Sequence, residues 1–79
     1  MSSNILLVED ESAIAEIVAY NLRKEGYAVT WEDDGIKGLL KAQSMMPDLC
    51  IVDVMLPGLD GLQICRVLNS EPRTRSIPI

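Results

Sequence analysis

The sequence predicts an α/β fold in which helices cover both faces of a parallel sheet. Short apolar runs rich in β-branched residues alternate with segments whose apolar residues recur at helical spacing. The runs are continuous rather than alternating, which is typical of strands buried on both faces. Connections are short, and the order strand, helix, strand, helix, strand, helix and the start of a further strand favours a parallel sheet.

Length and composition indicate one small domain, residues 1–79. Aromatic residues make up only 4% of the chain, so the core must be mainly aliphatic. The net charge is -5 and His is absent, which disfavours a nucleic-acid-binding surface. The amino terminus lacks the features of a secretory signal and no apolar run is long enough to span a membrane, so we expect a cytoplasmic location.

The two cysteines, Cys50 and Cys65, lie within an apolar run and a helical pattern. Neither C-x-x-C spacing nor a neighbouring His is present, so a zinc site is not expected. We predict that both are small core residues.

The first strand is predicted at 5–8, and it ends abruptly in three acidic residues, 9–11. Ser12 is the expected cap of a helix that continues to Lys24 and ends at Gly26. Its apolar positions fall on one predicted core-facing stripe: Ile14, Ile17, Val18 and Leu22.

A second strand is predicted at 27–31, at an edge of the sheet. The acidic cluster 32–34 that follows is interpreted as a solvated loop favouring the next helix's amino end rather than as a second metal site. That helix ends at Met46-Pro47, and its predicted stripe consists of Ile36, Leu39, Leu40 and Gln43.

The third strand is predicted at 49–53 and is followed by a Pro57-Gly58 turn. Asp60 is the expected cap of a third helix, with Ile64, Cys65 and Leu68 on its inner face. A polar connection then leads to 77–79, where the first residues of a fourth strand are expected.

Acidic residues follow two of these strands at the point where each strand ends. In a flavodoxin-like strand order 2-1-3, strand 5–8 lies beside strand 49–53 and their carboxyl ends adjoin. We therefore expect Glu9, Asp10 and Asp53 to converge within a few ångströms. A turn-capping role for Asp53 alone is the simpler alternative.

Three converging carboxylates repel one another unless protons or a cation neutralise them. Mg²⁺ prefers oxygen ligands and is usually held by one or two carboxylates plus phosphate oxygens. Such a site favours phosphoryl transfer, and carboxylates are known phosphoryl acceptors. Asp53 is the candidate acceptor, since the absence of His excludes Ser-His and Cys-His nucleophile pairs.

The segments 5–11, 47–61 and 77–79 resemble the receiver domain of two-component response regulators of the OmpR/PhoB type. The resemblance implies a CheY-like fold and a transcription-regulating output that is switched when a sensor histidine kinase phosphorylates Asp53. It also implies that Mg²⁺ is bound by Asp10, Asp53 and the backbone carbonyl of Met55. Glu9 would act mainly through metal-bound water. Such a domain is a phosphoacceptor, not an enzyme.

The sequence as given ends at Ile79, before the fourth strand of the family pattern is complete. The family's Ser or Thr after the fourth strand and Lys after the fifth are missing here. The alternative interpretation is therefore a signalling-incompetent fragment that keeps the acidic metal pocket. The open sheet edge would favour self-association or segment exchange.

Two other classes of protein are alternative interpretations of the sequence. A Mg²⁺-dependent phosphohydrolase with an Asp nucleophile would carry a D-x-D arrangement after the first strand, where this chain has Glu9-Asp10-Glu11. A flavin or dinucleotide binder would need a G-x-G-x-x-G motif and a loop free of carboxylates. Both fit the sequence less well.

Overall fold

The computed structural model describes residues 3–79, which form three strands and three helices. Their order is β1 (Asn4–Val8), α1 (Ser12–Lys24), β2 (Ala28–Glu32), α2 (Gly35–Met45), β3 (Leu49–Val52) and α3 (Gly61–Ser70). The strands are parallel and lie in the order β2-β1-β3. This confirms the predicted α/β fold, its flavodoxin-like order and the edge position of the second strand.

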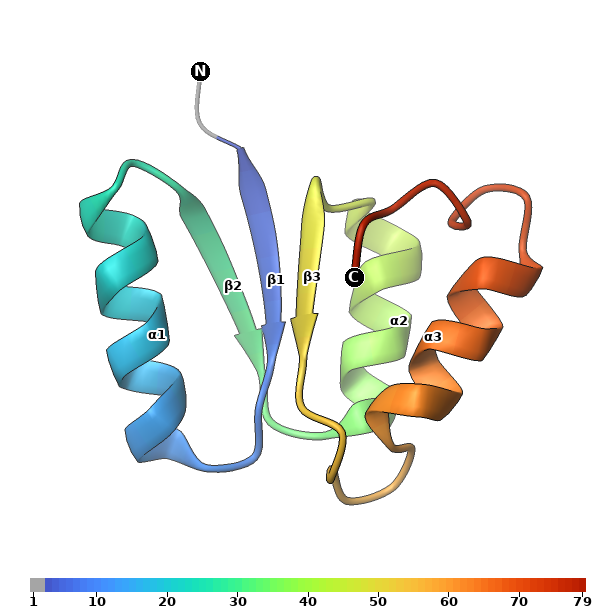
Figure 1. Cartoon of the computed structure of the whole chain (residues 1–79), viewed down its shortest axis with the longest axis horizontal. Helices are drawn as coiled ribbons and strands as arrows, with labels where there is room; N and C mark the ends of the chain where they lie inside the picture. Colours follow the sequence, from blue (N-terminus) through green and yellow to red (C-terminus); the bar gives the residue numbers. More distant parts are fainter. Residues whose placement is uncertain (1–2) are drawn as a thin grey trace.

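The helices form one layer on each side of the sheet (Figure 1). Helix α1 covers one face, whereas α2 and α3 pack side by side on the other. Strand β1 is central, and Val8 at its end pairs with Glu32 of β2 and Val52 of β3. All three strands therefore end at the same edge. Within residues 3–79, no helix is long and apolar enough to cross a membrane.

Two apolar clusters hold the layers together, one on each face of the sheet. The smaller cluster lies under α1 and contains Leu7, Ala15 and Ala19. The larger cluster lies under α2 and α3 and contains Leu6, Val8, Ala42, Cys50, Leu56, Ile64, Leu68 and Ile77. Alternate residues of β1 thus point into opposite clusters, as expected for a central strand.

Helix α1 differs from the prediction at its start and on its buried face. Ser12 is already the first helical residue, so it cannot be the cap; Glu11 precedes the helix and makes no side-chain capping bond. Ile14 and Ile17 of the predicted stripe are exposed, whereas Val18 packs against the smaller cluster and Leu22 is half-buried. The fully buried positions are Ala15 and Ala19. The small alanines let the helix lie close to the sheet.

Helix α2 buries only part of the predicted stripe: Leu39 packs against the larger cluster and Gln43 is half-buried. Ile36 and Leu40 are exposed, whereas Gly38 and Ala42 face the sheet. A β-carbon on Gly38 would lie 2.7 Å from the side chain of Val8, so only glycine permits this approach. The acidic loop before α2 behaves as expected, because Asp34 accepts a hydrogen bond of 2.8 Å from the Lys37 N–H and caps the helix.

The remaining boundaries follow the sequence closely, except at 77–79. Asp60 caps α3 and forms a reciprocal capping box with Gln63. No strand forms at 77–79, although the Cys50 N–H donates to the Pro78 carbonyl over 2.9 Å. Since Pro78 has no N–H of its own, it cannot complete a two-way ladder there.

Candidate functional site

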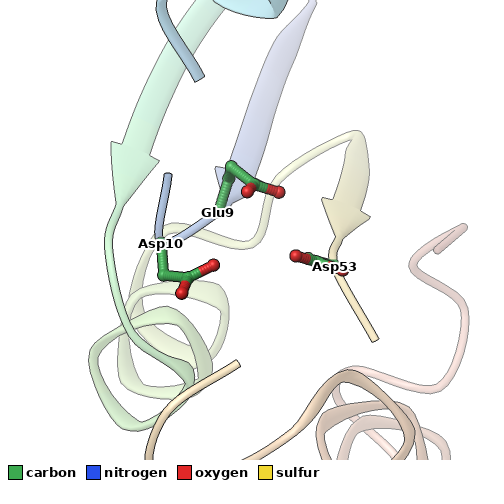
Figure 2. A group of neighbouring side chains, drawn as sticks. All are labelled: Glu9, Asp10 and Asp53. Carbon is green, nitrogen blue, oxygen red and sulfur yellow. The ribbon is translucent and has the colours of Figure 1, made fainter. Parts of the chain in front are cut away.

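The ends of β1 and β3 bring three carboxylates together. Glu9 and Asp10 follow β1, and Asp53 follows β3, where its N–H donates to the Val8 carbonyl over 3.0 Å. One carboxylate oxygen from each residue lies within 4.8 Å of the other two. Figure 2 shows the three side chains pointing toward one shared space. The convergence expected from the strand order is therefore observed.

Burial and nearby charge perturb the Glu9 carboxyl. Glu9 is buried, Asp53 is half-buried and Asp10 is exposed. Burial raises the pKa of the Glu9 carboxyl, and the nearby carboxylates of Asp53 and Asp10 raise it further. The hydrogen bond from the Glu11 N–H to Glu9 Oε1, 3.2 Å long, opposes this only in part. The cluster therefore concentrates negative charge.

The donor set fits a hard divalent cation. It offers only carboxylate oxygens, which Mg²⁺ and Ca²⁺ prefer to nitrogen or sulfur. Ion pairs among residues 3–79 join Lys37 to Asp33 and Asp34, and none reaches the cluster. An external cation would thus supply the positive charge that the surrounding side chains do not.

The loop after β3 is fixed at two points near Asp53. The Met55 N–H donates to Asp53 Oδ1 over 3.2 Å, which orients the carboxylate. The Gly61 N–H donates to the Val54 carbonyl over 3.2 Å. A β-carbon on Gly61 would lie 2.4 Å from the Asp53 carbonyl oxygen, so glycine allows the start of α3 to pack against the backbone of Asp53.

Met55 lies in this loop with an exposed side chain. No backbone N–H of residues 3–79 donates to its carbonyl oxygen, which leaves this oxygen available for a cation. Its role as a ligand stays a prediction.

Trp31 is a site neighbour that the sequence reasoning missed. Its indole Nε1–H donates to the Glu9 carbonyl oxygen over 2.7 Å, although Trp31 lies on β2 and Glu9 directly follows β1. The pairing of Trp31 with Leu7 in parallel strands places it two positions before Glu9. The predicted adjacency of these strands could have suggested proximity, but not this bond.

Comparison with known proteins agrees with this arrangement. Residues 5–79 match the family model for the response regulator receiver domain. The chain is 44% identical over 71 residues to the alkaline phosphatase synthesis transcriptional regulatory protein PhoP of Bacillus subtilis, covering 90% of this chain and 30% of that protein. It is 40% identical over 79 residues to the phosphate regulon transcriptional regulatory protein PhoB of Rhizobium meliloti, covering 100% and 35%. The chain spans about a third of the length of these relatives.

Solved structures share the fold. One is the receiver domain of sensor histidine kinase PA1611 from Pseudomonas aeruginosa, solved with a magnesium ion in its active-site cleft. It has a TM-score of 0.94 at 34% identity, over 100% of this chain and 65% of that chain. Chemotaxis response regulator CheY4 of Vibrio cholerae gives 0.94 at 29% identity, over 100% and 66%. The family match, the strand order and the three acids at one sheet edge together show that the chain belongs to the receiver domains of two-component response regulators.

Proposed function

We propose that this chain is a phosphoacceptor module in which Asp53 receives a phosphoryl group from the phosphohistidine of a sensor histidine kinase. Receiver domains of response regulators are signalling modules of this kind rather than ordinary enzymes. The convergence of the Glu9, Asp10 and Asp53 carboxylates carries the proposal. Phosphorylation would switch an output, and transcription is the output indicated by the names of the PhoP and PhoB relatives.

The proposal includes a divalent metal at the cluster. Asp10, Asp53 and the Met55 backbone carbonyl would hold Mg²⁺, with Glu9 acting mainly through a metal-bound water. When bound, Mg²⁺ would neutralise the carboxylates and stabilise the negative charge of the incoming phosphoryl group. The magnesium ion of the PA1611 receiver domain supports this choice of cation.

Asp53 needs no general base, because an ionised carboxylate is already a nucleophile. A carboxylate oxygen forms a bond to phosphorus while the phosphorus–nitrogen bond of the phosphohistidine breaks. The electron pair of that bond stays with the imidazole of the kinase. The Met55 N–H that binds Asp53 Oδ1 holds the carboxylate in one orientation for this attack.

The proposal is tested with acetyl phosphate and Mg²⁺, followed by mass spectrometry of the intact protein. We expect one phosphoryl group per chain on the natural sequence and none on Asp53→Asn. Asp33→Asn is the matched control, because it makes the same change at an exposed acid outside the cluster. Chelation of Mg²⁺ should abolish the modification. Undiminished phosphorylation of Asp53→Asn would overturn the assignment.

A further inference from the structure

Strand β2 holds the backbone on both sides of the Glu9 side chain. The Glu9 N–H donates to the Glu32 carbonyl over 3.1 Å, which fixes the peptide group before Glu9. The Trp31 indole N–H donates to the Glu9 carbonyl over 2.7 Å, which fixes the peptide group between Glu9 and Asp10. The first bond continues the parallel pairing of β1 with β2, whereas the second is made by a side chain.

Asp10 depends on this backbone more than the other two acids do. The Glu9 and Asp53 carboxylates each accept a hydrogen bond from a backbone N–H close by in the chain. Within residues 3–79, no N–H or O–H group donates to the Asp10 carboxylate, and its residue is exposed. The Asp10 carboxylate therefore has no hydrogen bond of its own, and the Trp31 bond restrains the backbone from which its side chain projects.

Without the Trp31 hydrogen bond, electrostatic repulsion would favour orientations in which the carboxylates lie farther apart. Three carboxylates with oxygens within 4.8 Å repel, and rotation of the Glu9–Asp10 peptide would relieve the repulsion in the metal-free protein. Burial does not force the indole onto this acceptor, because Trp31 keeps 37% exposure and water can reach the residue. The bond thus restrains the Glu9–Asp10 peptide group against the repulsion between the three carboxylates.

We propose that Trp31 is a positioning residue, whose indole N–H keeps Glu9 and Asp10 directed at the shared cation space beside Asp53. This inference rests on the proposed function, since it concerns affinity for Mg²⁺ at that cluster. A restrained loop binds a cation more tightly because less conformational freedom is lost on binding.

The test measures Mg²⁺ affinity by isothermal titration calorimetry, which needs no tryptophan signal. Trp31→Phe removes the N–H and keeps an aromatic ring, and we expect binding to weaken about threefold to tenfold, the range of one ordinary hydrogen bond. Val29→Ala is the control for loss of stability, because Val29 lies on the same strand and packs on the smaller apolar cluster. Its Mg²⁺ affinity should stay unchanged at a temperature where both variants are folded.

A second variant separates the N–H from the ring shape. Chemical synthesis can replace Trp31 with benzothienylalanine, which has sulfur where indole has N–H. We expect this variant to lose Mg²⁺ affinity to the same extent as Trp31→Phe, because both lack the N–H that binds the Glu9 carbonyl.

The outcomes distinguish a failure of the positioning role of Trp31 from a failure of the proposed metal site. Unchanged Mg²⁺ affinity in both Trp31 variants would overturn the positioning role and leave the metal site intact. An equal loss in Val29→Ala would also overturn it, because general loosening of β2 would then explain the effect. If the natural sequence binds no Mg²⁺, the proposed metal site fails and the inference falls with it.

Discussion

Glu9 is a buried acid whose surroundings favour its neutral form. Its residue is only 8% exposed, and the Asp53 and Asp10 carboxylates lie beside it. Burial and these like charges raise the pKa of the Glu9 carboxyl above its ordinary value of 4.5. In the unfolded chain the same carboxyl is solvated and titrates near its ordinary value. Glu9 therefore binds its proton more tightly in the folded state than in the unfolded state.

This difference predicts a pH-dependent effect of Glu9→Gln. The protonated Glu9 contributes stability that is fully present below pH 4.5 and is lost as pH rises through its raised folded pKa. At neutral pH without metal, the neutral glutamine should raise the free energy of unfolding, and this advantage should shrink as pH falls toward 4.5. Urea unfolding across this pH range measures the effect, with Glu16→Gln on α1 as the control. A difference independent of pH would contradict it.

The candidate acids could be predicted from the sequence, whereas their neighbour Trp31 could not. Glu9, Asp10 and Asp53 each follow a recognisable strand, and the strand order alone brings them to one edge. The Trp31 bond depends on the side-chain rotamer and on how far an indole reaches across to the next strand. Neither quantity leaves a pattern in a single sequence.

Helix α3 is the element whose buried face the sequence specifies best. Ile64 and Leu68 are fully buried on its inner face, and Leu62 projects outward. The same truncation at two positions of one helix should therefore have unequal effects. Leu68→Ala should lower the free energy of unfolding by about 2–5 kcal/mol through loss of burial and the cavity left behind.

Leu62→Ala is the matched control for Leu68→Ala. Leu62 is 56% exposed, so this substitution should change stability by less than about 0.5 kcal/mol. Chemical denaturation of both variants measures the contrast. Equal destabilisation would mean that the outward face of α3 is covered in solution.

The amino end of α3 predicts a separate effect at Asp60. Its carboxylate accepts a hydrogen bond of 2.9 Å from the Gln63 N–H, and the Gln63 side chain accepts one of 3.0 Å from the Asp60 N–H. Asp60→Ala should cost about 1 kcal/mol of stability. Asp60→Asn keeps an acceptor and should retain most of it. Thermal unfolding of the two variants measures the difference, and equal losses would rule out the capping explanation.

Helices α1 and α2 show where periodicity is insufficient. Apolar spacing locates both helices correctly but marks the packed face only in part. Val18 and Leu39 pack on the clusters, whereas two large apolar residues of each predicted stripe are exposed. Ala15 and Ala19 in α1, and Gly38 and Ala42 in α2, are small enough for the helix to approach the sheet closely. The approach distance is a property of the assembled layers, so helical spacing alone cannot reveal which stripe is buried.

The whole molecule exposes more large apolar side chains than the smaller cluster, under α1, buries. Exposed examples across the surface are Ile14, Ile17, Ile36, Leu40, Val54 and Met55. Ile51 on β3 is only partly buried and packs at the border of the smaller cluster. Exposed apolar surface favours association in water.

We therefore expect the 79-residue chain by itself to self-associate at micromolar concentration. Sedimentation velocity and small-angle scattering measure this, since the single chain has a Cα radius of gyration of 11.7 Å. Ile17→Gln removes a side chain of 63% exposure and should weaken the association without loosening the core. A compact monomer that melts cooperatively, with dimensions near that radius, would contradict the expectation.

The central place of β1 orders events as the nascent polypeptide leaves the ribosome. Asn4–Val8 are translated before either strand that flanks them, yet both of their backbone edges need those later strands as partners. One edge of β1 stays unpaired until Ala28–Glu32 has been translated, and the other until Leu49–Val52 has been translated. The acidic edge can therefore be complete only after the last of the three strands has been translated.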